Sequence, residues 1–166
     1  MALSALMTAA LCILAPLSVP IGPVPITLAV LVIALFPYLI GWKLSVLSVA
    51  LYLIIGAIGL PVFSGFEGGV QKLVGPTGGY LVGYVPFVLA AGVFIEKTDK
   101  RALHLFGLAI GLFLCYVLGT VWLSIHLKIG IGSALSKAVL PFLPFDAVKL
   151  VLALVIGPRV GKSIRT

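Results

Sequence analysis

Charged side chains are scarce in this sequence: only 9% of its 166 residues are Asp, Glu, Lys or Arg. A soluble domain carries about a quarter of its residues in this class. Hydrophobic residues make up 62% of the chain, and the mean hydropathy is +1.33. Because nearly every segment is too apolar to face water, an ordinary soluble domain is excluded. The composition indicates a multi-pass protein of the plasma membrane, with the lipid bilayer as its solvent.

Acidic residues are scarcer still, with four against eleven Lys and Arg, which gives a formal net charge of +7. The basic residues cluster at the ends of apolar runs, which is typical of membrane topology and argues against a nucleic-acid partner. Cysteine is also rare. Cys12 and Cys115 both lie inside apolar runs and form no disulfide or metal-binding pattern. We therefore expect no metal and no cofactor.

Proline, glycine and charged residues divide the chain into apolar stretches of nearly bilayer-spanning length. A spanning helix needs about 20 residues, with a range of roughly 17 to 25. We predict an all-α membrane protein, a compact bundle of six transmembrane helices in one domain over residues 1–166. The predicted spans are residues 2–18, 25–41, 44–60, 77–96, 102–126 and 141–158. The Gly- and Pro-rich stretches 18–27 and 60–79 are predicted to be structured loops.

The basic residues predict how these spans are oriented. Seven would lie on the side of the two termini: Lys43, Lys97, Lys100, Arg101, Arg159, Lys162 and Arg165. Three would lie on the opposite side: Lys72, Lys128 and Lys137. The positive-inside rule then places both termini in the cytoplasm. The longer, Gly- and Pro-rich loops face outward, where they either enclose a small ligand or simply cap the bundle.

The last predicted span opens with the segment "LPFDAVK", which places an acid and a base in an apolar helix. Pro144 suits the first helical turn, and Asp146 is favoured there by the helix dipole. Lys149 lies one turn deeper on the same face, and an ionisable residue within a span usually faces a cavity or a partner. Two interpretations stay open. Either the two residues only neutralise each other, or they line a pocket whose ligand meets the ammonium with an anionic group and the carboxylate with N–H donors.

Four glycines and a proline lie in the segment "VGPTGGYLVGY" at the start of the fourth predicted span. Thr77 is a candidate N-cap residue. Gly78 and Gly79 leave backbone N–H groups open to a ligand, and Tyr80 places a ring with a polar tip at the same level. Gly79 and Gly83 form a small-xxx-small pair, which predicts the close approach of another helix.

The outer loop before this span contains the segment "SGFEGGVQK". Its glycines allow the backbone around Glu67 to turn back and approach a ligand closely. Glu67 is therefore a candidate ligand contact. The alternative is that its carboxylate is simply solvated, since an outer loop touches water.

One apparent motif is rejected. The segment "GPRVGKS", residues 157–163, is similar to a phosphate-binding loop but lacks one residue between its glycines. Such a loop also needs a preceding strand and a following helix to direct its amides, whereas this one follows a membrane helix. We therefore expect no ATP hydrolysis by this chain, and no other enzymatic activity.

Four segments carry a resemblance to a known family in their order and spacing: "GPVPITL" (22–28), "IGLPVFSGFEGG" (58–69), "GPTGGYLVGY" (75–84) and "PFDAVK" (144–149). Together they closely resemble BioY, the biotin-specific substrate-binding subunit (S component) of energy-coupling-factor (ECF) transporters. The resemblance covers essentially the whole chain. It implies a six-helix bundle that captures biotin from outside, while a transmembrane T subunit and two ATPase subunits drive uptake.

The resemblance also implies roles for particular residues. Asp146 and Lys149 match the family's pair in the last helix, and Glu67 matches its glycine-flanked polar loop position. Tyr80 and Phe66 would pack on the rings of biotin. The segment "ALMTA" is similar to the alanine motif by which S components dock on the T subunit, which makes Ala5 and Ala9 candidate interface residues.

Two other classes of function fit the sequence less well. A small membrane enzyme needs His, Asp or Glu clustered on facing helices, and Asp146 is the single plausible intramembrane acid. A stand-alone transporter working as a homo-oligomer on an ion gradient needs a further buried acid for the coupling ion, and the sequence offers none. Co-purification of T and ATPase subunits would favour the S component, and a lone oligomer the stand-alone transporter.

Overall fold

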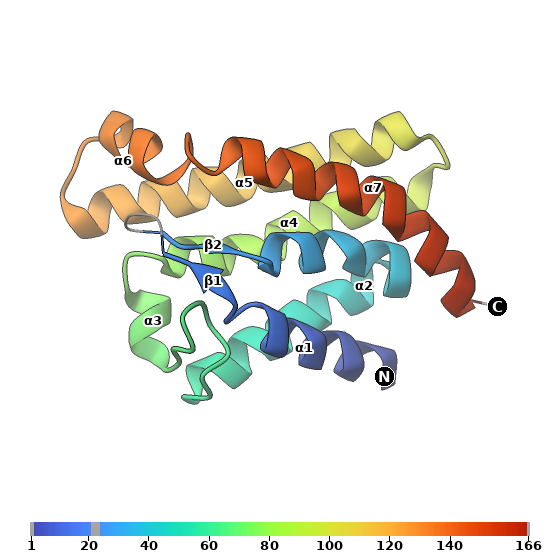
Figure 1. Cartoon of the computed structure of the whole chain (residues 1–166), viewed down its shortest axis with the longest axis horizontal. Coiled ribbons are helices and arrows are strands. Elements are labelled where there is room, and N and C mark those ends of the chain that lie inside the picture. Colours follow the sequence, from blue (N-terminus) through green and yellow to red (C-terminus); the bar gives the residue numbers. More distant parts are fainter. Residues whose placement is uncertain (1, 21–23, 166) are drawn as a thin grey trace.

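The protein is described by a computed structural model that covers residues 2–20 and 24–165, and most of this chain is helical (Figure 1). The helices are α1 (Ala2–Leu14), α2 (Ala29–Ala57), α3 (Val70–Val74), α4 (Gly78–Lys97), α5 (Arg101–Leu127), α6 (Ile131–Ala138) and α7 (Leu143–Arg165). Two short strands, β1 (Ser18–Val19) and β2 (Ile26–Thr27), pair antiparallel with Ser18 opposite Thr27. The all-helical class predicted from the sequence is confirmed.

Helix α2 is broken at Gly41, where the backbone adopts a φ of +74° and a ψ of 167°. This region of φ is open to glycine and strained for other residues. Figure 1 shows α2 reversing its direction there, so that its two halves run back along each other. The turn predicted between the second and third apolar stretches is therefore confirmed.

Within the described residues, three helices are long and apolar enough to cross a membrane: α2, α4 and α5. Helices α6 and α7 give a fourth candidate if the pair, bent by 58°, is taken as one broken span. Helix α1 is apolar but has only 13 residues. The structure thus supports a protein that crosses the membrane several times, whereas the number six stays a prediction.

Glycines allow α4 to lie directly against α5. A Cβ atom on Gly83 would be 3.0 Å from the Cα of Cys115, and one on Gly79 would be 2.8 Å from the carbonyl oxygen of Leu118. Side chains at these positions would force the helices apart. The close approach predicted from Gly79 and Gly83 is confirmed, and it brings the start of α4 beside the middle of α5.

Helix α1 is held to the second half of α2 by hydroxyl groups. The Ser4 and Ser48 hydroxyls are 2.9 Å apart, and Thr8 donates to the backbone oxygens of both residues. All three side chains are buried, while Ala5 and Ala9 are exposed on another face of α1.

The termini, the break in α2 and the α4–α5 connection share one end of the molecule, and the β1–β2 hairpin, α3 and α6 share the other (Figure 1).

Candidate functional site

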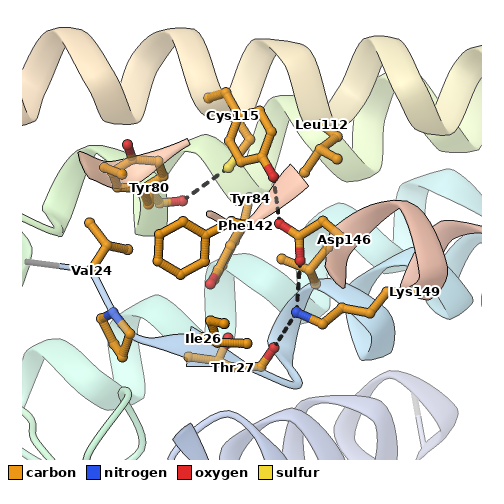
Figure 2. Close-up of a pocket in the computed structure, with 14 residues that line it drawn as sticks. Val24, Ile26, Thr27, Tyr80, Tyr84, Leu112, Cys115, Phe142, Asp146 and Lys149 are labelled. Atoms are coloured by element: carbon orange, nitrogen blue, oxygen red, sulfur yellow. Dashed lines mark hydrogen bonds and ion pairs between the residues drawn. The ribbon is translucent and has the colours of Figure 1, made fainter. Parts of the chain in front are cut away.

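A pocket lies at the hairpin end, enclosed by β2, the start of α2, and parts of α4, α5 and α7 (Figure 2). Its cavity is about 50 Å³, which is small beside the roughly 300–1,000 Å³ of small-molecule sites. Side chains lining it must therefore move apart to admit a ligand. It is lined by Val24, Pro25, Ile26, Thr27, Val30, Tyr80, Tyr84, Leu112, Cys115, Tyr116, Ala138, Phe142, Asp146 and Lys149.

The polar side of the pocket is a connected set of short hydrogen bonds. The Nζ of Lys149 lies 2.7 Å from Oδ1 of Asp146 and donates to the backbone oxygen of Thr27 at 2.9 Å. The hydroxyl of Tyr116 donates to Oδ2 of Asp146 at 2.6 Å. Asp146 is 4% exposed and Lys149 is 9% exposed. The predicted ion pair is therefore present. Its two charges neutralise each other and also line a pocket (Figure 2).

The start of α7 explains why the acid can be buried here. Asp146 lies in the first turn, where free backbone N–H groups and the helix dipole favour a negative charge. Its own amide donates to the oxygen of Phe142 at 2.8 Å. Lys149 follows on the same face of the helix, so α7 by itself aligns the two charges.

The opposite side of the pocket is aromatic and apolar. Figure 2 shows the rings of Tyr80, Tyr84 and Phe142 grouped around the space beside Asp146. The Tyr80 hydroxyl lies 3.4 Å from that of Thr120 on α5. The pocket therefore combines a flat apolar wall with a paired anion and cation, which suits a small ligand having both a ring system and polar groups.

Other predicted site residues lie outside this pocket. Glu67 pairs with Lys72 at 2.6 Å near the surface of the protein, and Phe66 is 64% exposed with a left-handed φ of 59°. Glu67 and Thr77 line a second, open cleft of about 420 Å³. The structure thus brings Asp146, Lys149 and Tyr80 together in the pocket. It leaves Glu67, Phe66 and Thr77 outside the pocket.

The start of α4 differs from its prediction in two respects. Thr77 occupies the predicted N-cap position, but its side chain makes no capping hydrogen bond within the described part of the chain. The amide of Gly78 already donates to the oxygen of Gly75 at 3.0 Å, which corrects the expectation that it stays open to a ligand. Gly78 and Gly79 are buried, and a Cβ on Gly78 would collide with the backbone of Leu73.

Sequence reasoning missed Tyr116 and Thr27 as parts of the polar network. Their partners lie 30 and 122 residues away along the chain, so no local motif joins them. For Tyr116 a signal was available, since a phenol in the middle of the apolar run "LFLCYVLG" needs a hydrogen-bond partner when it is buried. For Thr27 the acceptor is a backbone oxygen, which any residue would supply.

The fold and the pocket together define a class: a helical, multi-pass membrane protein that encloses a small-molecule pocket with a buried ion pair. A family model described as the BioY family matches residues 1–166. The chain therefore belongs to the BioY family, as its motifs predicted.

Individual relatives agree with this membership. The chain is 43% identical over 155 residues to the "Biotin transporter BioY" of Thermotoga maritima, covering 93% of this chain and 91% of that one. It is 38% identical over 145 residues to the "Probable biotin transporter BioY" of Pyrococcus horikoshii, covering 87% and 85%. A 2.1 Å crystal structure of the S-component for biotin from an ECF-type ABC transporter matches with a TM-score of 0.89 and 34% identity, over 97% of this chain and 89% of that one. The protein is a multi-pass membrane protein of this transporter family.

Proposed function

We propose that the protein is the substrate-binding subunit of an ECF-type vitamin importer and captures biotin from outside the cell. The observation that carries this proposal is the enclosed pocket, in which a buried Asp146–Lys149 pair faces an aromatic wall. Its relatives named as biotin transporters, and the fold shared with a biotin S-component, support the choice of ligand.

The pocket's chemistry suits the parts of biotin. The fused rings pack on Tyr80 and the neighbouring aromatic side chains, which bury apolar area. The carboxylate of Asp146 accepts N–H donors from the ureido group, because an ionised carboxylate has about four lone-pair sites and its two protein donors occupy two. The Lys149 ammonium donates to an anionic or carbonyl oxygen of the ligand in place of its bond to Thr27.

We assign the remaining predicted residues to the outer part of the same site. Glu67 and Thr77 line the outer cleft. Phe66, which precedes Glu67 in the chain, is exposed. Thr77 and Tyr80 lie one turn apart at the start of α4, so the cleft and the pocket share one helix end. Gly78 and Gly79 lie between them and, because they lack side chains, let the start of α4 pack closely against Leu73 and α5. In this proposal biotin meets the outer cleft before it reaches Asp146 and Lys149.

We further infer that six segments cross the membrane, with both termini in the cytoplasm. The two halves of α2 count separately because the chain reverses at Gly41. Both termini lie at the end opposite the hairpin (Figure 1), and this is the end where seven of the basic residues fall. The site then opens toward the outside, as import requires.

The energy for import comes, in this proposal, from partner subunits: a transmembrane T subunit and two ATPases. The chain itself performs no chemical reaction. Ala5 and Ala9 are exposed on α1, and their small side chains let a partner helix approach closely. Affinity purification of the tagged chain, expressed together with candidate T and ATPase subunits, tests this part. Recovery of all partners is expected, whereas recovery of a lone homo-oligomer would favour a stand-alone transporter.

Ligand capture is tested separately by retention of labelled biotin on membranes that contain the chain alone. Unlabelled biotin and desthiobiotin, which keeps the ureido group and the carboxylate, should both compete. Glucose should not. Retention equal to that of membranes lacking the chain would refute the assignment of biotin.

A further inference from the structure

Another polar cleft, of about 550 Å³, lies at the end of the molecule that carries both termini. It is formed where α2, α4, α5 and α7 come together, and its lining includes Tyr38, Glu96, Asp99, His104 and Lys162. Gly161 of α7 also lines it. Twelve residues separate Gly161 from Lys149, about 18 Å at about 1.5 Å per residue, so this cleft is distinct from the biotin pocket.

Two buried side chains in this cleft have a polar atom without a partner among residues 2–20 and 24–165. These atoms are the hydroxyl of Tyr38 and Nδ1 of His104. Tyr38 is 6% exposed and His104 is 8% exposed, and their rings meet edge to face with centroids 5.5 Å apart. Buried polar groups are nearly always hydrogen-bonded in folded proteins. Both atoms are fully buried, so the two side chains must turn toward the cleft before a ligand can supply the missing bonds.

The hydrogen bond of His104 shows which kind of ligand group could bond to its free nitrogen. Its Nε2 lies 2.6 Å from the backbone oxygen of Thr98. A carbonyl oxygen can only accept, so Nε2 carries the proton and Nδ1 of the neutral ring is an acceptor. The carboxylates of Glu96 and Asp99 add further acceptors, and Glu96 is held in place by the amide of Trp42 at 3.1 Å. Beside the Lys162 ammonium, which also lines it, the cleft therefore presents acceptors to a ligand with several N–H donors and a positive charge.

The surroundings favour a zwitterion over a simple cation. Basic residues dominate this end of the chain, including Lys97, Lys100 and Arg101 next to the two acids. A basic protein segment would be repelled by them, whereas a molecule with a phosphate beside its ammonium would meet both signs of charge. The cleft also lies where α4 ends and α5 begins, and both are candidate membrane spans. Because the ends of membrane-spanning helices lie at the level of the lipid headgroups, the cleft lies at this level too.

We propose that this cleft binds the headgroup of a zwitterionic phospholipid that has a primary ammonium, as phosphatidylethanolamine does. The ammonium donates to Nδ1 of His104 and to the carboxylates of Glu96 and Asp99, and the Tyr38 hydroxyl completes its coordination. The phosphate meets the basic residues at the α4–α5 connection. The inference concerns a lipid and is independent of the proposed biotin site.

The test is native mass spectrometry of the full chain with added lipids that share the same acyl chains. Phosphatidylethanolamine and its mono-, di- and trimethylated forms carry three, two, one and no N–H donors on the same charge. Binding should weaken along this series, by about tenfold in total, since a hydrogen bond to a charged group is a strong one. Equal binding of phosphatidylethanolamine and phosphatidylcholine would overturn the proposal. Soluble phosphoethanolamine should compete only weakly; competition as strong as the lipid's would show a site for a free amine phosphate and would also overturn it.

Two variants test the named side chains. Tyr38→Phe removes a hydroxyl that has no partner in the described structure, so it should leave the melting temperature unchanged or raised while the preference for phosphatidylethanolamine falls. The matched control is Tyr52→Phe, because Tyr52 donates to Val62 elsewhere in the fold at 3.1 Å. It should lower the melting temperature and leave the lipid preference intact. The double variant E96Q/D99N keeps the shape of exposed side chains and should abolish the preference. Wild-type preference in both Tyr38→Phe and the double variant would refute the site.

Discussion

Replacing Lys149 by methionine tests whether the buried ion pair exists as the structure has it. Methionine keeps the length of the side chain but leaves Asp146, which is 4% exposed, as a charge without its counter-ion. Lys149→Met also removes two hydrogen bonds, one to Asp146 at 2.7 Å and one to Thr27 at 2.9 Å. Breaking a buried pair from one side destabilises a protein by about 3–5 kcal/mol.

This loss should be visible in thermal unfolding of the detergent-purified protein, followed by intrinsic fluorescence. For a chain of this length about 1 kcal/mol corresponds to about 2–4 °C, so a loss of about 3 kcal/mol lowers the melting temperature by about 6–12 °C. Lys137→Met is the matched control, since Lys137 is exposed on α6, and it should leave the melting temperature within about 1–2 °C.

The double variant Asp146→Asn/Lys149→Met tests whether the two charges are paired. Neutralising both partners leaves no unpaired charge, and the Asn side chain can still accept a hydrogen bond from Tyr116. We therefore expect the double variant to melt above Lys149→Met, because replacing a whole buried pair is often nearly neutral. A melting temperature for Lys149→Met equal to that of the wild type, or losses that simply add in the double variant, would show that the two charges are not paired in the folded protein.

Three further predictions follow from single contacts. Tyr116→Phe removes the 2.6 Å bond to Asp146 and should weaken biotin binding by about tenfold or more, measured by equilibrium binding, since a charged hydrogen bond contributes about 1.5–3 kcal/mol; an unchanged affinity would contradict this. Gly83→Val should lower the melting temperature by about 2 °C or more, because its Cβ would lie 3.0 Å from the Cα of Cys115 and overpacking costs about 1–3 kcal/mol. Gly41→Ala meets a φ of +74°, which costs an L-residue about 1–2 kcal/mol, and a thermal scan showing no loss would argue against the break in α2.

The parts of the fold that could be predicted from the sequence are those bounded by local signals. The predicted span 77–96 corresponds to α4 (Gly78–Lys97), and 102–126 corresponds to α5 (Arg101–Leu127). In both cases an apolar run is bounded by charged residues or by Gly and Pro. The turn at Gly41 was found for the same reason, since Gly41 and Lys43 together interrupt an apolar stretch.

The ends of the first and last spans were less predictable. Helix α1 ends at Leu14, and the chain then enters the β1–β2 hairpin, where the sequence predicted helix to residue 18. The strands have two residues each, which is too short for any pattern of alternation to show. Helix α6 was also missed, because the bend of 58° before α7 depends on how both helices pack on α5.

Within the candidate site, Asp146 and Lys149 were predictable because their spacing of three residues places them on one helix face. Tyr116 and Thr27 were not, because their contacts depend on how distant segments pack. Glu67 shows the converse: its glycine-rich surroundings predicted a ligand contact, but its nearest cation is Lys72 on the next helix, at 2.6 Å. The sequence alone does not show that Glu67 and Lys72 form an ion pair, because this depends on how the chain folds between them.

The most direct test of the central claim is calorimetric titration of biotin into the detergent-purified protein, beside Asp146→Asn and Lys149→Ala. We expect one biotin bound per chain in the wild type and a large loss of affinity in both variants, with thermal scans confirming that each variant is folded at the temperature of the titration. No binding heat in a folded wild-type protein, or wild-type affinity in both variants, would contradict the assignment of biotin to the pocket of Asp146 and Lys149.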